Sequence, residues 1–488
     1  MAWEKGGSIR SCDALLKRVE DNDPKLTELV ILPMKTFGMA DMERLSNAIA
    51  SGGNTNLQSI SASGHRLPPD SLKQFGLALS TQAKALLQNK ENTPSGITSV
   101  AIGSKDMGDE GMIAFCEGLE ESNGGLLQCL DFGWKNLGKE GVQAIGRTFA
   151  TSKYLTHIDL SRNNAIGSEG IKCIANAAKE KSENGTVAFP SLEKMILSEC
   201  NIDSTGVQSL TDIIIGADNN RSKPIYLAIS SNPLGSEGCG ELSKLCAIPG
   251  KGSMISHLHL SQCSIGDEGI KLLSSAAISN SCIGLTVLDL SGNSITKDGV
   301  KVFAESLGES WPDLVELKMA KNELEGDGVT SMMGALIARR DGTTDEPAGK
   351  KNTTLQNLDL SCTNCGIEGA KAALMGGGLS TLRMFNNRLG SDGFNSLSSL
   401  LQGGHPSIEN LDLGGNDAGE EAVVALLNAI ADTQEGEASS KLSVLEIGGN
   451  KFGEEAMVAL NELKQVWPLL DVAHDNPVED AQEEELLE

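Results

Sequence analysis

One short pattern recurs fourteen times along this chain and limits the folds that the chain can adopt. Each copy has a leucine-type residue, two variable positions, Leu-x-Leu, then Asn or a substitute, and a Gly a few residues after the next apolar residue. The clearest copy runs from Leu285 to Gly299. A unit of this size exposes half of its apolar residues unless neighbouring units cover them, so the pattern predicts a solenoid.

The spacing of the copies leaves room for one strand and one helix in each. It ranges from 24 residues, between Leu355 and Leu379, to 41 residues, between Leu314 and Leu355. The copies begin at Leu26, Leu57, Ile97, Leu127, Leu155, Leu192, Pro224, Ile255, Leu285, Leu314, Leu355, Leu379, Ile408 and Leu442.

Each copy predicts a strand followed by a helix. The leucines alternate with variable residues, which indicates a short strand with its leucines inward, and the segment after the Gly has a helical pattern. Because helices are wider than strands, we expect a curved α/β solenoid of about 14 repeats, with parallel strands on a concave face and helices on a convex face. We expect residues 1–25 to form an N-terminal cap, 26–468 the solenoid, and 469–488 a strand-like end with an acidic tail.

Two recurrent polar positions have structural interpretations. A Ser or Asp near each helix start is expected to cap its first turn, at Ser168, Ser204, Ser236, Asp267 and Ser391. An Asn follows the strand in seven repeats, where its amide is expected to satisfy buried backbone groups of the neighbouring loop. These residues are Asn163, Asn232, Asn293, Asn322, Asn387, Asn416 and Asn450. The Gly of each repeat is expected where a helix approaches its strand closely.

Charge and cysteine usage narrow the compartment and the partners. The chain has 66 acidic and 40 basic residues, for a formal net charge of -26, so it repels phosphate backbones and anionic lipid heads. We therefore expect neither nucleic acid nor a membrane as partner. The eleven scattered cysteines and the lack of a secretory signal predict a cytoplasmic protein, with the nucleus or its periphery as a further location.

The concave face carries the candidate partner-binding residues. Acidic side chains stand between the two strand leucines at Asp131, Asp159, Asp289, Asp359 and Asp412, with Glu446 at the end, and His259, Lys318 and Arg383 interrupt them. Larger or polar residues stand out elsewhere on this face at Trp134, His157, Arg162, Tyr226, His257 and Phe385. Exposed aromatics and arginines are frequent anchors of protein interfaces. Asp between the two strand leucines is also simply common in the residue pattern of such repeats. A partner-binding role and a role without a partner therefore both stay open for the acidic row.

The sequence gives little support for a metal site, a redox site or a nucleotide site. His257 and His259 share a surface, but a zinc site needs a third ligand. Cys362 and Cys365 form the one Cys-x-x-Cys, and its place inside a repeat favours core packing. Glycine-rich segments at 235–240 and 247–253 lack the spacing of nucleotide loops. We therefore predict a non-catalytic protein without metal or cofactor.

Four polar insertions lie between a helix and the next strand. They are solvated loops or, alternatively, loops that recognise a partner. The insertions are 88–95, 179–191, 339–354 and 432–441.

The residue pattern of the repeats resembles that of a known family. Leu-x-x-Leu-Asp-Leu-Ser-x-Asn/Cys-x-Ile-Gly-Asp-Glu-Gly is similar to the ribonuclease-inhibitor class of leucine-rich repeats, over almost the entire chain. The closing repeat, with Gly449-Asn-Lys-Phe-Gly-Glu-Glu455, also resembles that of Ran GTPase-activating proteins. That resemblance implies a small GTPase such as Ran as partner and Arg66 as the candidate residue for GTPase activation. A protein-binding scaffold and a ribonuclease-inhibitor-like inhibitor are the other functions that the class implies.

Overall fold

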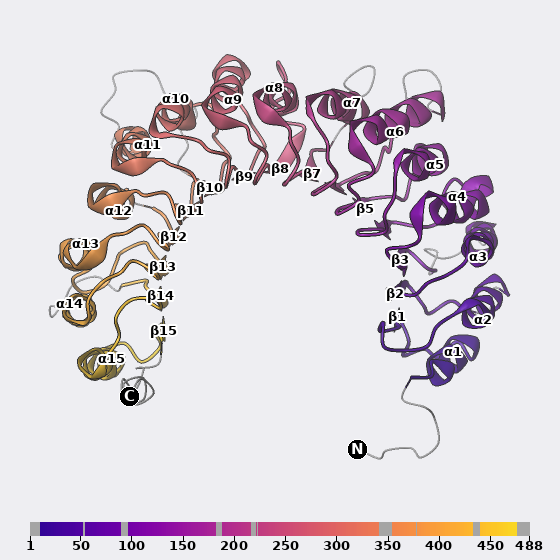
Figure 1. The fold of residues 1–488 in the computed structure, drawn as a ribbon, viewed down its shortest axis with the longest axis horizontal. Helices are drawn as coiled ribbons and strands as arrows, with labels where there is room; N and C mark the ends of the chain where they lie inside the picture. The colour runs from indigo at the N-terminus through magenta and orange to yellow at the C-terminus, as the bar shows by residue number, and fades with distance from the viewer. Residues whose placement is uncertain are drawn as a thin grey trace, which may run out of the picture. The chain divides into compact units, whose positions relative to one another are not determined.

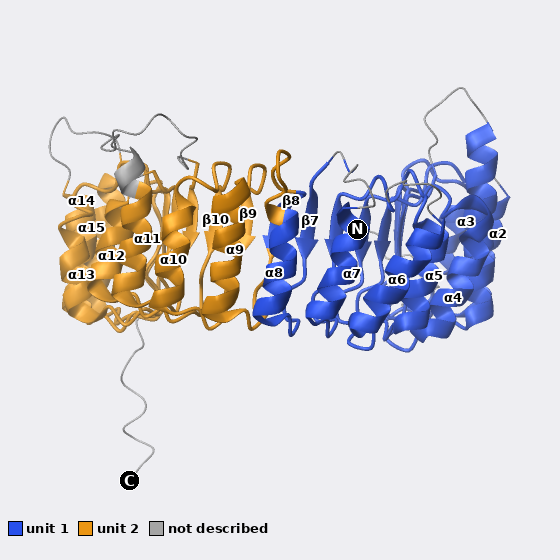
Figure 2. Cartoon of the chain, turned by 90° about the horizontal axis from the view of Figure 1, so that it is seen from above, with its two compact units in different colours: residues 1–245, 254–258 blue, residues 246–253, 259–488 orange. Residues whose placement is uncertain are grey.

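The computed structural model describes residues 10–51, 54–88, 96–181, 188–215, 221, 223–340, 354–376, 378–432 and 440–475. Most of the four polar insertions and the whole acidic tail lie outside these residues. The chain divides into two compact units, which Figure 2 colours separately. Unit 1 ends at Leu245 and also includes Met254–Leu258, whereas unit 2 comprises Cys246–Ser253 and the chain from His259 onward.

Unit 1 alternates strands and helices from its first helix onward. Its strands are β1 (Glu28–Val30), β2 (Ser59–Ser63), β3 (Ser99–Gly103), β4 (Cys129–Asp131), β5 (His157–Asp159), β6 (Lys194–Ile196) and β7 (Ile225–Ala228), and β8 (Ile255–His259) has all but its last residue here. Its helices are α1 (Asp13–Glu20), α2 (Met39–Ala50), α3 (Pro69–Gln88), α4 (Gly108–Leu119), the 3-10 turn η1 (Glu120–Ser122), α5 (Lys139–Phe149), α6 (Gly167–Lys181) and α7 (Ser204–Ile215), with α8 (Gly235–Cys246) at its end.

Unit 2 continues the same alternation. Its strands are β9 (Val287–Asp289), β10 (Glu316–Lys318), β11 (Asn357–Asp359), β12 (Thr381–Arg383), β13 (Asn410–Asp412), β14 (Val444–Glu446) and β15 (Asp471–Ala473). Its helices are α9 (Gly266–Asn280), α10 (Lys297–Leu307), α11 (Glu325–Arg340), α12 (Gly366–Met375), α13 (Gly390–Ser398), α14 (Glu420–Ala431) and α15 (Glu454–Val466).

The predicted fold class is confirmed. All fourteen copies of the pattern contain a strand, and β15 adds one more in the segment after the last copy. In each unit the strands pair in parallel and follow one another in chain order, as the register of β9 with β10 and of β4 with β5 illustrates. Figure 1 shows that the strands of each unit line the inner side of its bend and that the helices lie outside.

The core consists of thin layers of aliphatic side chains, one layer from each repeat. In β9 the inward residues Leu288 and Leu290 are fully buried, and Leu317 of β10 lies in register with Leu288. Burial of each such side chain stabilises the fold by about 1.5–3 kcal/mol. Some layers of the core contain aromatic rings. The centroid of the Phe115 ring lies 6.2 Å from that of Phe75 and 5.5 Å from that of Phe132.

The expected role of the turn asparagines is confirmed. All seven are buried, and each amide bridges two repeats. Asn293, for example, donates through Nδ2 to the carbonyls of Leu260 and Leu290, at 2.7 and 2.9 Å, and its Oδ1 accepts the Cys263 N–H at 2.8 Å. Where Cys200 replaces the Asn, its thiol donates to the Leu160 carbonyl instead.

The predicted capping residues lie within the first turn of their helices, one residue or more after the position of a cap. Helix α7 begins at Ser204, so its cap is Asp203, whose Oδ1 accepts the Thr205 N–H at 2.9 Å. The predicted cap Ser168 belongs to the preceding helix, and its hydroxyl donates to Asp203 Oδ1 at 2.6 Å. Hydrogen bonds from Ser168 and Thr205 lower the pKa of Asp203 to about 2. Four of the five predicted caps therefore form hydrogen bonds with the next repeat, namely Ser168, Ser204, Asp267 and Ser391.

The Gly in the first helical turn of a repeat can lie against the preceding helix rather than against the strand, as at Gly299. A Cβ at Gly299 would lie 3.1 Å from Asp267 Cα, in the first turn of the preceding helix. The same Asp267 accepts the Thr296 N–H and hydroxyl at 2.8 and 2.7 Å, and Thr296 caps α10. The expectation of a close helix-to-strand approach was wrong, because the tight contact joins adjacent helices.

One buried histidine of unit 2 makes stability depend on pH. Nδ1 of His405 accepts the N–H groups of Ser407 and Ile408, at 3.2 and 3.0 Å, so Nε2 carries the proton and donates to the Leu374 carbonyl at 3.2 Å. Burial lowers the pKa of His405, and the Leu374 carbonyl opposes this only in part. The unfolded chain, with a histidine pKa of about 6.5, therefore binds the proton more readily than the folded chain.

We expect the free energy of unfolding to fall as the pH drops below about 6.5, by up to about 1.4 kcal/mol per pH unit from this group, until the folded-state pKa is reached. Urea unfolding at about pH 7.5 and 5.5 measures the change. The variant His405→Asn retains an acceptor and a donor but does not titrate, so it should lose this part of the dependence. An equal pH dependence in both proteins would contradict the role of His405.

Candidate functional site

The concave face of each unit consists of three rows of side chains. Row one is the residue before the first inward leucine of a strand, row two lies between the two leucines, and row three follows the second. In β9 these residues are Val287, Asp289 and Ser291. Because paired strands are parallel and in register, residues of the same row are neighbours across the sheet.

Row two of unit 2 alternates acidic and basic side chains. It contains, from β9 to β13 and in register, Asp289, Lys318, Asp359, Arg383 and Asp412. Each cation lies between carboxylates of the two neighbouring strands, whose backbones are about 4.8 Å away on either side. The two predicted interruptions therefore compensate Asp289 and Asp359 in part, although Nζ of Lys318 also pairs with Oε1 of Glu316 at 2.9 Å.

The first of these carboxylates also faces a histidine. Nδ1 of His259 lies 3.7 Å from Oδ2 of Asp289. Burial by itself would raise the pKa of Asp289, but hydrogen bonds from His259 and Ser291, together with the charge of Lys318, hold it below its usual value. Asp289 is thus an ionised and already partnered group.

Two pairs of carboxylates are direct register partners in row two and are called uncompensated because no row-two cation lies between their members. Asp131 and Asp159 are register partners in unit 1, and Asp412 and Glu446 are register partners in unit 2. Burial lowers the pKa of Lys135, and the charges of the first pair, Asp131 and Asp159, raise it against this effect. Burial raises the pKa of Asp412, and the charges of Glu446 and Asp359 raise it further, against the Gly414 N–H and Arg383. Like charges at such spacing destabilise each other, so a cation placed between them is favourable.

Each uncompensated pair lies next to an exposed aromatic ring and a glycine floor. In unit 1, a Cβ built on Gly133 would lie 3.5 Å from Oδ1 of both Asp131 and Asp159, and the next residue, Trp134, is 63% exposed. Trp134 has a φ of 57°, in the left-handed region that disfavours large side chains. The same turn position has a positive φ in other repeats, as at Arg162 and Glu199, so it is the exposure of Trp134 and not its φ that sets it apart from the core.

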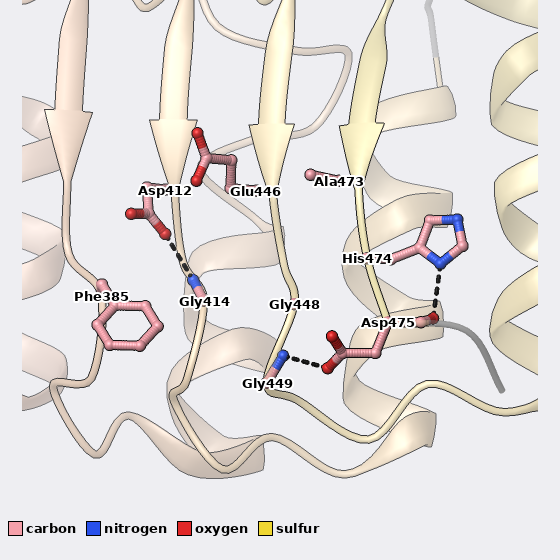
Figure 3. A pocket seen from close by; sticks show the side chains of 9 residues that line it. All are labelled: Phe385, Asp412, Gly414, Glu446, Gly448, Gly449, Ala473, His474 and Asp475. Atoms are coloured by element: carbon pink, nitrogen blue, oxygen red, sulfur yellow. Dashed lines mark hydrogen bonds between the residues drawn. The ribbon is translucent and has the colours of Figure 1, made fainter. Parts of the chain in front are cut away.

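The pair in unit 2 borders a hollow of about 350 Å³. Figure 3 shows Phe385 on one side, Asp412 and Glu446 on adjacent strands, and His474 with Asp475 on the other side. The Phe385 ring lies over Gly414 and Gly415, where any Cβ would come within about 3 Å of it. The sequence predicted Phe385 and Asp412 as partner-binding residues. It did not predict His474 and Asp475, because these residues follow β15, outside the fourteen copies of the pattern.

His474 and Asp475 are held by contacts within unit 2. The imidazole of His474 stacks on Phe452 with 4.3 Å between ring centroids, and its Nδ1 donates to the Asp475 carbonyl at 2.8 Å. The Asp475 carboxylate accepts the Gly449 N–H. The hollow therefore combines an aromatic wall with three carboxylates, which suits a cationic side chain.

Row one of unit 1 has a different character. His157, Lys194, Tyr226 and His257 occupy it on β5 to β8. The sequence predicted three of them as partner-binding residues and missed Lys194, because a single lysine in a variable position is unremarkable until its neighbours across the sheet are known. His257 thus faces Tyr226, whereas His259 faces Asp289.

Arg162 and Arg66 lie beside the concave face, in the turns after their strands. Arg162 follows β5 and its Nε lies 3.1 Å from Oε1 of Glu199, so it reaches a partner only by sharing this exposed ion pair. Arg66 is exposed in the segment between β2 and α3, next to the buried His65. Arg162 holds the turn position that Trp134 holds in the preceding repeat, whereas Arg66 lies in the turn after β2.

Metal, thiol and membrane features are limited in the described part of the chain. Its residues contain no group of three or more potential metal ligands. Cys365 is buried, and burial raises the pKa of its thiol to about 12, as core packing requires. Across the same described residues, each helix is too short or too polar to cross a bilayer.

Comparison with known proteins finds repeats of the same kind. The Leucine Rich repeat family profile matches residues 151–175, 253–274 and 281–304. Human "NACHT, LRR and PYD domains-containing protein 5" is 28% identical over 281 residues, which cover 58% of this chain and 21% of that protein. Mouse "Ribonuclease inhibitor" is 23% identical over 409 residues, which cover 77% of this chain and 83% of that protein.

The chain thus spans about a fifth of the length of the NACHT relative. Among solved structures, that of the TLR13–ssRNA13 complex is similar with a TM-score of 0.39 and 15% identity, over 90% of this chain and 62% of that one.

Proposed function

This chain is a leucine-rich repeat protein of the ribonuclease-inhibitor-like class, and from that premise we propose that it is a non-catalytic scaffold that binds a partly basic protein on its concave faces. The observation that carries the proposal is the pairing of uncompensated carboxylates with an exposed aromatic ring in each unit. Trp134 follows the turn glycine that lies beside Asp131 and Asp159, and Phe385 lines the hollow that Asp412 and Glu446 border.

Both places favour a lysine or arginine side chain of the partner. A cation relieves the repulsion between the carboxylates and gains from the face of the neighbouring ring, a contact worth about 0.5–2 kcal/mol. The carboxylates are held in register by the sheet before binding, so little conformational entropy is lost. An anchor of this kind dominates the binding energy of an interface.

The proposal predicts that neutralising one pair weakens partner capture. For the double variant Asp131→Asn with Asp159→Asn, we expect affinity for the captured partner to fall about tenfold or more. The matched control is Glu169→Gln with Glu368→Gln, two exposed helix carboxylates with the same change in net charge. Quantitative capture from lysate by the three proteins, followed by mass spectrometry and a salt titration, provides the measurement. A partner lost equally from the control would contradict a site on the concave face.

Inhibition of a ribonuclease is a narrower form of this function. It is supported by the similarity to mouse "Ribonuclease inhibitor", which extends over 83% of that protein. A pancreatic-type ribonuclease assayed with the chain tests it directly. Inhibition that survives neutralisation of both carboxylate pairs would reject the residues that we propose, while leaving the activity itself established.

Activation of a small GTPase is the other narrower form. It is supported by the exposed position of Arg66 in a turn at the edge of unit 1, where a bound GTPase can reach it. Single-turnover GTP hydrolysis by Ran, with the wild-type chain and with Arg66→Ala, tests it. Stimulation that persists without Arg66 would reject the residue, and no stimulation would reject the activity.

A further inference from the structure

A stack of three side chains crosses the last three strands of the concave face in unit 1. Lys194 on β6 and Tyr226 on β7 are register partners, and Nζ of Lys194 lies 4.6 Å from the centroid of the Tyr226 ring. The Tyr226 ring lies 5.4 Å from that of His257 on β8, with 34° between the ring planes. His157 on β5 is the register partner of Lys194 on the other side. These four residues are called the basic strip.

The floor next to the strip is neutral. On β6 and β7, row two holds Ile196 and Ala228, and row three holds Ser198 and Ser230. At these described strand positions no carboxylate faces Lys194 or Tyr226, in contrast to the alternating charges of row two in unit 2.

Carboxylates at the edges of the strip are engaged elsewhere. Glu199 pairs with Arg162 at 3.1 Å, and Glu193 pairs with Lys223 at 3.2 Å. Asp159, in row two of β5, belongs to the uncompensated pair already described. The strip is therefore a local region of basic and aromatic character on a chain whose net charge is -26.

We propose that the basic strip docks an acidic, extended segment of a protein partner. Its carboxylates would accept hydrogen bonds from the Lys194 ammonium and the Tyr226 hydroxyl, and its backbone would lie over the low serine floor. Cation–ring and ring–ring contacts already order the three side chains, so binding costs little further entropy. The inference goes beyond a basic partner for the carboxylate pairs, because it requires charge of the opposite sign.

The local charge can act against the acidic surroundings because salt screens distant groups. The Debye length is about 8 Å at physiological ionic strength, which exceeds the spacing of neighbouring strands but not the width of a unit. A long nucleic acid would meet the acidic groups along the whole face, whereas a short acidic segment over β6–β8 meets Lys194, Tyr226 and His257, with Asp159 on β5 only at its edge. These considerations favour the acidic peptide over RNA or DNA.

The six histidines of the chain allow the site to be mapped by NMR. Two of them, His157 and His257, belong to the strip, whereas His65 and His405 are buried elsewhere and His259 and His474 lie in unit 2. The full chain, labelled at histidine, is titrated at physiological salt with a short Glu-rich peptide and with the same peptide carrying Gln in place of Glu. We expect the Glu-rich peptide to shift the signals of His157 and His257 selectively and the Gln peptide to leave them unchanged.

A charge-reversal pair separates local docking from general attraction. Lys194→Glu should lower the affinity for the Glu-rich peptide about tenfold, since like charges then meet at the contact. Lys172→Glu, on helix α6, changes the net charge by the same amount outside the strip and should stay within about twofold, as expected for an exposed lysine away from the contact. Equal loss in both variants, no binding of the peptide, or tighter binding of a single-stranded oligonucleotide of equal charge would each overturn the proposal.

The outcome is independent of the proposed scaffold function. Asp131→Asn with Asp159→Asn should lower the affinity for a basic partner about tenfold or more and leave binding of the Glu-rich peptide unchanged or stronger. Loss of peptide binding in that double variant would count against the strip as the docking surface.

Discussion

Replacement of Asn293 by alanine is expected to lower the free energy of unfolding around repeats eight and nine of unit 2 by about 3–5 kcal/mol. The amide is fully buried, and it binds the carbonyls of Leu260 and Leu290 and the N–H of Cys263. Alanine leaves these backbone groups buried without their partner, at about 1–3 kcal/mol for each. The penalties overlap, so their sum is an upper limit.

Hydrogen exchange is the suitable measurement, because stability in a repeat array is local. The amide of Cys263 should lose protection in Asn293→Ala, while the amides of Lys135 and Leu137, which donate to Asn163 in unit 1, keep theirs. Asn164→Ala, at an exposed position next to Asn163, should change stability by less than about 0.5 kcal/mol.

A second substitution introduces the residue that another repeat of this chain has at the same position. Cys occupies the corresponding position at Cys200, where its thiol donates to the Leu160 carbonyl at 3.1 Å. Asn293→Cys keeps one donor and should cost about half as much as Asn293→Ala. Equal protection of Cys263 in wild type and in Asn293→Ala would show that the amide adds nothing to the repeat contact.

Replacement of Arg221 by methionine is expected to destabilise unit 1 by about 2–3 kcal/mol. The guanidinium is buried and donates to the carbonyls of Ile214, Leu192 and Ala188, at 3.0, 3.2 and 2.8 Å. Ile214 lies in the last turn of α7, whose negative dipole end favours a cation. Burial lowers the pKa of Arg221 to about 10, so the group stays charged at neutral pH.

The estimate is the difference of two effects. Three hydrogen bonds from a charged donor contribute about 1.5–3 kcal/mol each, whereas methionine avoids the desolvation of a buried ion. Arg221→Lys keeps the charge but not the fork of donors, so it should fall between wild type and Arg221→Met. Thermal unfolding with hydrogen exchange at α7 measures both, and Arg162→Met, at an exposed turn, is the control. A methionine variant as stable as the control would contradict this role.

Local patterns predicted most of the repeat structure. The alternation of leucines placed the strands, and the seven asparagines were correctly interpreted, because both follow from satisfying one apolar face and one buried turn in every unit. The caps at Ser168 and Ser204 were misjudged because the groups that they bind belong to the next repeat, which spacing within one copy does not reveal.

The candidate site was predicted as a list of residues but not as an arrangement. Asp289, Lys318 and Asp359 were identified singly, yet whether they compensate one another depends on register between strands that lie 29 and 41 residues apart. Lys194 became notable only when Tyr226 was found beneath its ammonium group.

The sequence by itself therefore determined the unit: its strand, its buried leucines and the polar residue that closes its turn, since these depend on contacts that every repeat makes with an identical neighbour. Only the tertiary structure decided which carboxylates stay uncompensated, where Arg221 finds its three carbonyls and how Phe385 and His474 frame one hollow. Those features join positions that follow no period, so their free energy depends on distances in space that sequence spacing does not encode.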